Sequence, residues 1–155
     1  MLFRQLFDSE SSTYTYLLAA DYGKDAVIID PVKRNVNQYL TLIKQLDLTL
    51  VAAMDTHLHA DHITAIGELS KTLNCKSMMG EQSQAGGVSA KFRDNDILDF
   101  GGLKITVIYT PGHTDDSYCF LMSDRIFTGD TLFIRGTGRT DFQNGSASQQ
   151  YDSLL

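Results

Sequence analysis

The segment Thr56-His57-Leu58-His59-Ala60-Asp61-His62 holds three of the four histidines of this 155-residue chain. The fourth, His113, lies in Thr110-Pro111-Gly112-His113-Thr114. A chain that used histidine for general packing would scatter these residues along its length. Neutral imidazole is the most common metal ligand, and the first cluster also contains a carboxylate, Asp61. The two segments therefore predict two halves of one metal site.

The first cluster lies between a predicted strand and a predicted helix. Leu48 to Met54 is an apolar run typical of a buried strand, and apolar residues from Ile63 to Leu73 recur at helical spacing. We expect Asp61 and His62 at the N-terminus of this helix. Ligand sites in α/β proteins commonly lie beyond the carboxyl ends of strands, which suits a functional role for the cluster.

The alternation of side chains along an extended turn predicts which residues of the histidine cluster face the same way. Alternate side chains point the same way, so His57, His59 and Asp61 are expected to face one cavity. His62 is adjacent to Asp61 and is expected to point elsewhere, or towards a neighbouring metal.

Two further candidate ligands lie at the ends of predicted strands. His113 lies in a turn between two predicted strands, and Asp130 directly follows another in Thr128-Gly129-Asp130. We expect these strand ends to converge at one edge of a sheet sandwich. A helix is expected at about 35–47, and strands at 13–18, 26–30, 97–100, 103–109, 117–122 and 125–128.

The composition is that of one globular domain. Hydrophobic residues make up 43% and charged residues 21% of a 17.2 kDa chain, which argues against disorder. The formal net charge of -6 argues against nucleic acid as a partner. No apolar run approaches the roughly 18 residues of a membrane span, and no secretory signal pattern is present. Cys75 and Cys119 match no disulfide or zinc framework, so we expect two buried thiols in a cytoplasmic protein.

Three of the quoted segments resemble the signatures of the metallo-β-lactamase superfamily: the histidine cluster, Pro111-Gly112-His113-Thr114, and Thr128-Gly129-Asp130. Asp30, which ends a strand before Pro31, also matches the early aspartate of this family, which supports the metal loop. The resemblance implies an α/β fold of the αββα sandwich type, with the metal at the edge between two β-sheets.

A narrower resemblance covers nearly the whole chain. His59-Ala60-Asp61-His62-Ile63-Thr64, Phe127-Thr128-Gly129-Asp130-Thr131-Leu132 and above all the run from Ile134 to Gln143 look like the persulfide dioxygenases. Hydrolase branches of the superfamily usually lack that run. Many persulfide dioxygenases carry cysteine where this chain has Thr137, which removes any thiol role there.

The persulfide dioxygenase resemblance implies an Fe(II) site with one iron per chain, held by His57, His113 and Asp130. It further implies oxidation of glutathione persulfide by O2 to sulfite and glutathione. His59, Asp61 and His62 would orient the ligands and bind waters. The oligomeric state, a homodimer included, is left open.

Two arginines of the discriminating run have two interpretations each. Arg135 and Arg139 are either surface charges, with Asp141 as an ion-pair partner, or contacts for an anionic glutathione carboxylate. Arg139 is the better candidate for substrate binding because it lies deeper in the run.

Two other functions remain open at this stage. One is a dinuclear Zn2+ thioesterase resembling glyoxalase II, in which His57, His59 and His113 hold one metal, Asp61 and His62 help to hold a second, and Asp130 bridges them. The other is a non-catalytic relative that binds metal or a partner.

The family also implies an expectation for the C-terminus. Relatives continue through a strand with another histidine and terminal helices, whereas 148–155 reads as the opening of a helix. We therefore expect a single domain, 1–155, that lacks those elements, exposes apolar surface and is poorly stable as a monomer. A cooperative melt of such a monomer at high temperature would contradict this.

Overall fold

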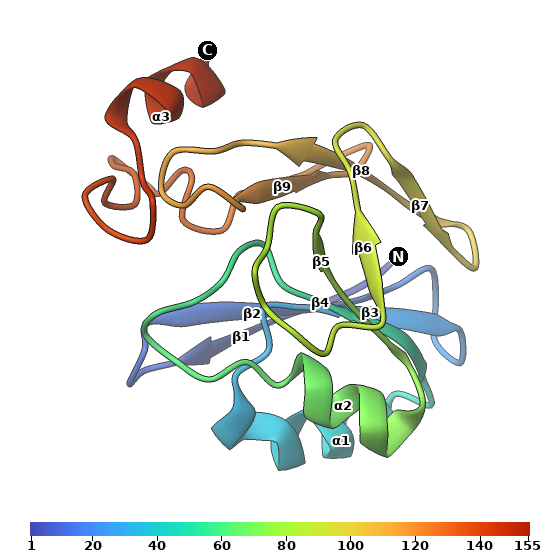
Figure 1. The fold of residues 1–155 in the computed structure, drawn as a ribbon. Helices are drawn as coiled ribbons and strands as arrows, with labels where there is room; N and C mark the ends of the chain where they lie inside the picture. Colours follow the sequence, from blue (N-terminus) through green and yellow to red (C-terminus); the bar gives the residue numbers. More distant parts are fainter.

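The computed structural model describes all 155 residues and builds two β-sheets packed face to face (Figure 1). The first sheet has the order β1-β2-β3-β4-β5-β6 and the second β10-β9-β8-β7. The strands are β1 (Leu2–Asp8), β2 (Thr13–Ala19), β3 (Asp25–Ile29), β4 (Thr49–Met54), β5 (Lys76–Gly80), β6 (Ala90–Phe92), β7 (Ile97–Phe100), β8 (Leu103–Tyr109), β9 (Tyr118–Leu121) and β10 (Ile126–Phe127).

Helices cover the far face of the first sheet. The helices are the 3-10 turn η1 (Lys33–Asn35), α1 (Val36–Gln45), α2 (Ile66–Leu73) and α3 (Ala147–Leu154). In Figure 1, α1 and α2 lie below the first sheet, while α3 lies at one end of the second sheet. β3, β4 and β5 pair in parallel, and α1 and α2 make the two crossovers between them. The expected α/β class is confirmed.

Strand β3 explains why the layers stack in this order. Ile28 belongs to the apolar core between the first sheet and the helices, whereas Val27 and Ile29 belong to the core between the two sheets. Side chains alternate between the faces of a strand, so a strand covered on both sides must be apolar throughout. The run Ala26 to Ile29 is accordingly fully buried.

The helix after the histidine cluster starts later than expected. The prediction that Asp61 and His62 begin this helix is wrong, because α2 begins at Ile66. The intervening residues are held in an irregular turn: the Lys33 N–H donates to the carbonyl of Ile63, and Thr64 pairs with Val32 in an isolated bridge. These contacts with the segment after β3 use backbone groups that a longer helix would need.

Most expected elements are present, with shifted ends. The helix predicted at about 35–47 is η1 followed by α1, which ends at Gln45, and the predicted C-terminal helix is α3. Three strands were not predicted, namely β1, β5 and β6. Cys75 and Cys119 are free and buried, as expected. No helix has the length and apolar character needed to cross a membrane.

The outer face of the second sheet carries an exposed apolar row. Ile97, Leu121 and Ile126 lie in one register across β7, β9 and β10, with Thr106 of β8 between the first two. All three apolar side chains are exposed. These three side chains form an exposed apolar row on this face.

Candidate metal centre

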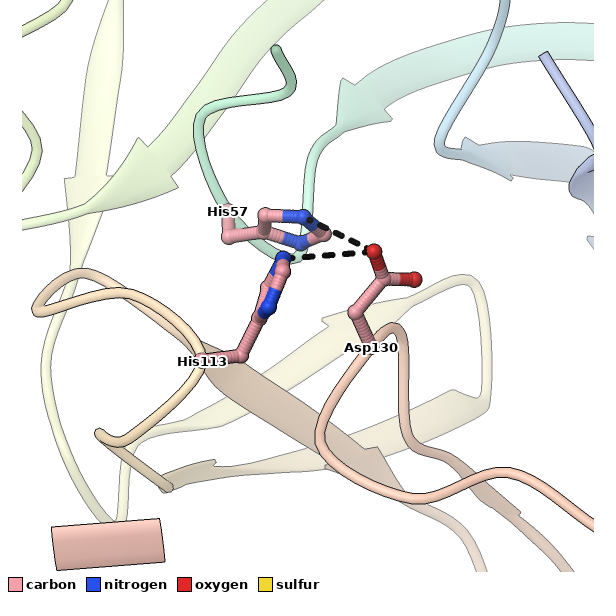
Figure 2. A group of neighbouring side chains, drawn as sticks. All are labelled: His57, His113 and Asp130. Carbon is pink, nitrogen blue, oxygen red and sulfur yellow. Dashed lines mark ion pairs between the residues drawn. The ribbon is translucent and has the colours of Figure 1, made fainter. Parts of the chain in front are cut away.

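Three strand ends bring His57, His113 and Asp130 together (Figure 2). His57 follows β4, His113 lies between β8 and β9, and Asp130 follows β10. The Nε2 atoms of both histidines face the same carboxylate oxygen, Asp130 Oδ2, at 3.7 Å for His57 and 3.2 Å for His113. The convergence expected from the sequence is present.

The tautomer of His57 is set by a chain of hydrogen bonds from Asp30. The Thr56 hydroxyl donates to Asp30 Oδ2 at 2.9 Å, and the Thr56 N–H donates to Oδ1 at 2.8 Å. Since its proton is committed to the carboxylate, the Thr56 oxygen accepts from His57 Nδ1, 2.9 Å away. The lone pair of His57 therefore lies on Nε2, the atom that faces Asp130.

His113 is oriented by a backbone contact. Its Nδ1 donates to the carbonyl of Arg139 at 2.7 Å, which turns Nε2 towards Asp130. Gly138 makes this approach feasible, because a Cβ at that position would lie 2.6 Å from His113 Nδ1 and 2.4 Å from the Asp130 carbonyl oxygen. The Arg139 carbonyl and Gly138 both belong to the run from Ile134 to Gln143, which carried the narrower family resemblance in the sequence.

The surroundings shift the pKa of each of the three groups. Burial lowers the pKa of His57 to about 3, so its imidazole is neutral. Burial works to raise the pKa of Asp130, but the hydrogen bond from His113 outweighs it and lowers that pKa. Burial works to lower the pKa of His113, and the contacts with Asp130 and the Arg139 carbonyl raise it overall.

The donor set fits a metal ion. Ligands bound at about 2.0–2.2 Å lie about 3.0–3.6 Å from one another around one ion, close to the separations of the Nε2 atoms from Asp130 Oδ2. Both imidazoles have their other nitrogen fixed by a hydrogen bond, as metal-ligating histidines almost always do. Asp130 is the one ligand whose side chain is about 38% exposed, so the site opens to solvent at the carboxylate.

The other cluster residues form a separate group. His59, Asp61 and His62 offer ligand atoms that lie within 4.8 Å of one another. Unlike the expected alternation, Asp61 is grouped with His59 and His62, while the centroid of the His59 ring lies 4.2 Å from that of His57. His62 faces this second group, which is one of the two orientations expected for it. The chain turns after Leu58, so the strict alternation of an extended strand does not continue there.

His59 is bound to the same aspartate that orients Thr56. Its Nε2 lies 3.0 Å from Asp30 Oδ1. Burial works to lower the pKa of His59, but the Asp30 charge and hydrogen bond outweigh it and raise that pKa to about 9. Asp30 therefore supports the loop, as the sequence predicted. Next to it, burial raises the pKa of Asp55 to about 7.

The two candidate substrate arginines lie at the surface. The Arg139 guanidinium makes a two-point ion pair with Asp141, at 2.7 and 3.0 Å, and its side chain is 65% exposed. The Arg135 side chain is exposed and forms no ion pair. In this arrangement Arg139 touches the centre through its carbonyl oxygen.

Sequence reasoning missed residues that hold the metal loop from other parts of the chain. Asp116 and Gln143 bind the backbone of Leu58, which lies between His57 and His59. No pattern distinguishes Asp116 from Asp115 in the sequence, although only Asp116 is buried. Gly138 lay inside the discriminating run but was not singled out.

The fold and the histidine–aspartate centre define the class of protein. The chain belongs to the metallo-beta-lactamase superfamily, whose family model matches residues 9–155.

Within the superfamily, the chain is similar to persulfide dioxygenases. It is 42% identical to "Persulfide dioxygenase ETHE1, mitochondrial" of Bos taurus, covering 99% of this chain and 61% of that protein. The crystal structure of ETHE1 from Myxococcus xanthus superposes with a TM-score of 0.96 at 52% identity, covering 99% of this chain and 68% of that chain.

A hydrolase relative is more distant. The "Probable hydroxyacylglutathione hydrolase" of Schizosaccharomyces pombe is 35% identical over 91% of this chain and 56% of that protein. The chain thus spans about three fifths of the length of the curated relatives it matches.

Proposed function

We propose that this chain carries the active site of a non-haem Fe(II) persulfide dioxygenase that acts on glutathione persulfide. The observation that carries the proposal is the set of two imidazoles and one carboxylate, with both Nε2 atoms facing Asp130 Oδ2. Two histidines and one carboxylate are the ligand set of non-haem Fe(II) oxygenases. The likeness to proteins named as persulfide dioxygenases supports the substrate class.

The chain's own groups account for holding the metal. Thr56 binds Nδ1 of His57 and the Arg139 carbonyl accepts from Nδ1 of His113, so Nε2 of each histidine is the atom directed at the metal position. Ionised Asp130 contributes the negative charge. Bound at such a triad, Fe(II) leaves coordination positions open for a substrate sulfur and for dioxygen.

The overall reaction balances without a further reductant. A persulfide, a dioxygen and a water give a thiol, a sulfite and a pair of protons, and the terminal sulfur supplies the electrons that reduce dioxygen. In the proposed reaction, His59, Asp61 and His62 orient the ligands and bind water beside the centre. Arg139 would bind a glutathione carboxylate after its guanidinium leaves the exposed pair with Asp141.

One observation favours a second candidate. His59, Asp61 and His62 together could contribute to a second metal position, as a dinuclear zinc hydrolase of glutathione thioesters would require. The higher identity to a persulfide dioxygenase, 42% against 35% for a hydroxyacylglutathione hydrolase, keeps this candidate second.

Metal analysis and substrate assays separate the candidates. Metal per chain is measured by mass spectrometry, and oxygen uptake is followed on glutathione persulfide with a glutathione thioester assayed in parallel. We expect about one iron per chain and oxygen uptake that depends on the persulfide. Two zincs per chain with thioester cleavage would overturn the proposal, and metal without either activity would favour a non-catalytic role.

The compartment remains a prediction. The sequence-based expectation is a cytoplasmic protein, while the name of the bovine relative assigns that protein to mitochondria. Fractionation of the source cells, followed by immunodetection of the chain, tests the expectation.

A further inference from the structure

The backbone of Leu58 is bound on both sides by side chains from other loops. Its N–H donates to Asp116 Oδ2 at 3.0 Å, and its carbonyl accepts from Gln143 Nε2 at 2.9 Å. Leu58 directly follows His57 and directly precedes His59. The peptide groups on the two sides of Leu58 therefore determine how the loop that carries His57 and His59 lies.

Asp116 also reaches the loop of the second histidine. Its Oδ1 accepts from the Thr114 hydroxyl at 2.7 Å, and Thr114 is the residue after His113. The Asp116 residue is only 4% exposed, so this bridge is shielded from water. One buried carboxylate thus joins the residue after His57 to the residue after His113.

Gln143 makes the equivalent connection to the third loop. It lies in the 131–145 segment, which also supplies the Arg139 carbonyl that orients His113. A link from this segment to Leu58 holds the His57 loop in register with the part of the chain that fixes His113.

We propose that Asp116 and Gln143 are positioning residues that set the separation of His57 from His113 by clamping Leu58. This inference rests on the metal centre of the proposed function. Neither residue points a ligand at the metal; both act through the backbone between the histidines.

The chemistry of the clamp predicts which substitutions it tolerates. A carboxylate accepts at both oxygens, as Asp116 does here. In an Asp116→Asn variant, the amide oxygen still accepts from the Leu58 N–H, and the amide nitrogen donates to the Thr114 hydroxyl oxygen, whose proton turns to Ser117 Oγ 2.6 Å away. An Asp116→Ala variant keeps neither contact.

The test uses Co2+ as the probe, because its visible absorption reports the ligand geometry independently of turnover. The Co2+ dissociation constant, the absorption spectrum and the melting temperature are measured for the purified protein and its variants. We expect Asp116→Ala to weaken Co2+ binding about 10- to 100-fold, the usual effect of losing groups behind metal ligands, and to change the spectrum. Asp116→Asn should restore most of the affinity and the spectrum.

Asp115→Ala is the matched control. It removes the same charge one residue away, at a side chain that contacts Asn144 and not Leu58. We expect wild-type affinity and spectrum from this variant, and a loss equal to that of Asp116→Ala would overturn the proposal by showing that local charge is responsible.

Gln143→Met keeps the test decisive if Asp116→Ala does not fold. It keeps the side-chain length at a half-buried position and removes only the donor to Leu58. We expect several-fold weaker Co2+ binding with an altered spectrum. If Asp116→Ala folds and keeps the wild-type Co2+ affinity and spectrum, the clamp is overturned while the proposed function stands. If Asp116→Ala is unfolded, the same result in Gln143→Met overturns the clamp. A wild-type protein that binds no metal overturns the metal centre itself.

Discussion

His113 donates a hydrogen bond from Nδ1 to the backbone carbonyl of Arg139 at 2.7 Å. The contact joins a ligand of the proposed centre to the segment that best separates this chain from hydrolases by sequence. A backbone acceptor cannot be removed by substitution at position 139, so the orientation of His113 is independent of the arginine side chain. The two roles of this segment, holding His113 and offering a guanidinium, can therefore be tested separately.

Gly138→Ala should disturb the centre by steric contact. The new Cβ would lie 2.6 Å from His113 Nδ1 and 2.4 Å from the Asp130 carbonyl oxygen, so one of these residues must shift. We expect metal affinity to fall about tenfold or more, measured by chelator competition. Gly136→Ala is the control from the same loop, because a Cβ there meets nothing within 4 Å. Equal metal affinity in both variants would contradict the prediction.

Substitution of the ligands should separate the two histidine groups. His57→Ala or Asp130→Ala should abolish iron retention, since each removes a donor from the triad. His62→Ala should keep iron but lose activity, because His62 belongs to the second group. Iron content by mass spectrometry and oxygen uptake decide the matter. Complete iron loss in His62→Ala would show that the assignment of ligands is wrong.

Arg139→Ala should raise KM for glutathione persulfide while leaving iron content unchanged. A charge-assisted hydrogen bond contributes about 1.5–3 kcal/mol, which corresponds to roughly tenfold or more in KM. Stability should change little, since the pair with Asp141 is exposed. Asp141→Asn is the control, because it releases the guanidinium without removing it. Unchanged KM in Arg139→Ala would rule out the guanidinium as a substrate contact.

The ion pair between Asp8 and Arg34 should make stability depend on pH. Arg34 holds the pKa of Asp8 well below its ordinary value of 3.8. A carboxyl whose pKa is lower in the folded state stabilises the fold above its unfolded pKa, and this stability is lost as the pH falls through the folded pKa. Asp8→Asn should therefore cost about 1–2 kcal/mol of unfolding free energy at neutral pH.

Urea unfolding of the wild type and Asp8→Asn checks this dependence. We expect the difference in unfolding free energy to narrow as the pH falls from about 4 towards 2. Glu10→Gln serves as the comparison, because Glu10 also pairs with Arg34 but its side chain is 73% exposed. Glu10→Gln should have little effect on the unfolding free energy at about pH 4 or about pH 2. If the difference in unfolding free energy between the wild type and Asp8→Asn stays constant from about pH 4 to about pH 2, the lowered pKa of Asp8 is refuted.

The parts of the fold that sequence predicted best are those with strong local signals. β3 is a buried apolar run stopped by Pro31, and α1 has a clear helical period, so both were expected at nearly their observed positions. β6 has three residues and β5 contains Lys76 and Gly80, so neither shows an alternating pattern long enough to recognise. The pairing of β5 with β4 and of β6 with β5 depends on packing in the sheet interior.

The sequence by itself determined the chemistry that this protein can offer: its histidines and aspartates, their spacing, and the family to which those motifs belong. The motifs already implied the grouping of His57 with His113 and Asp130, and only the tertiary structure decided that His59 lies beside Asp30. The physical reason is that a turn has no fixed side-chain period, so contacts from distant loops set its directions. Asp116, Gln143 and the Arg139 carbonyl set those directions here, and no sequence pattern indicates these contacts.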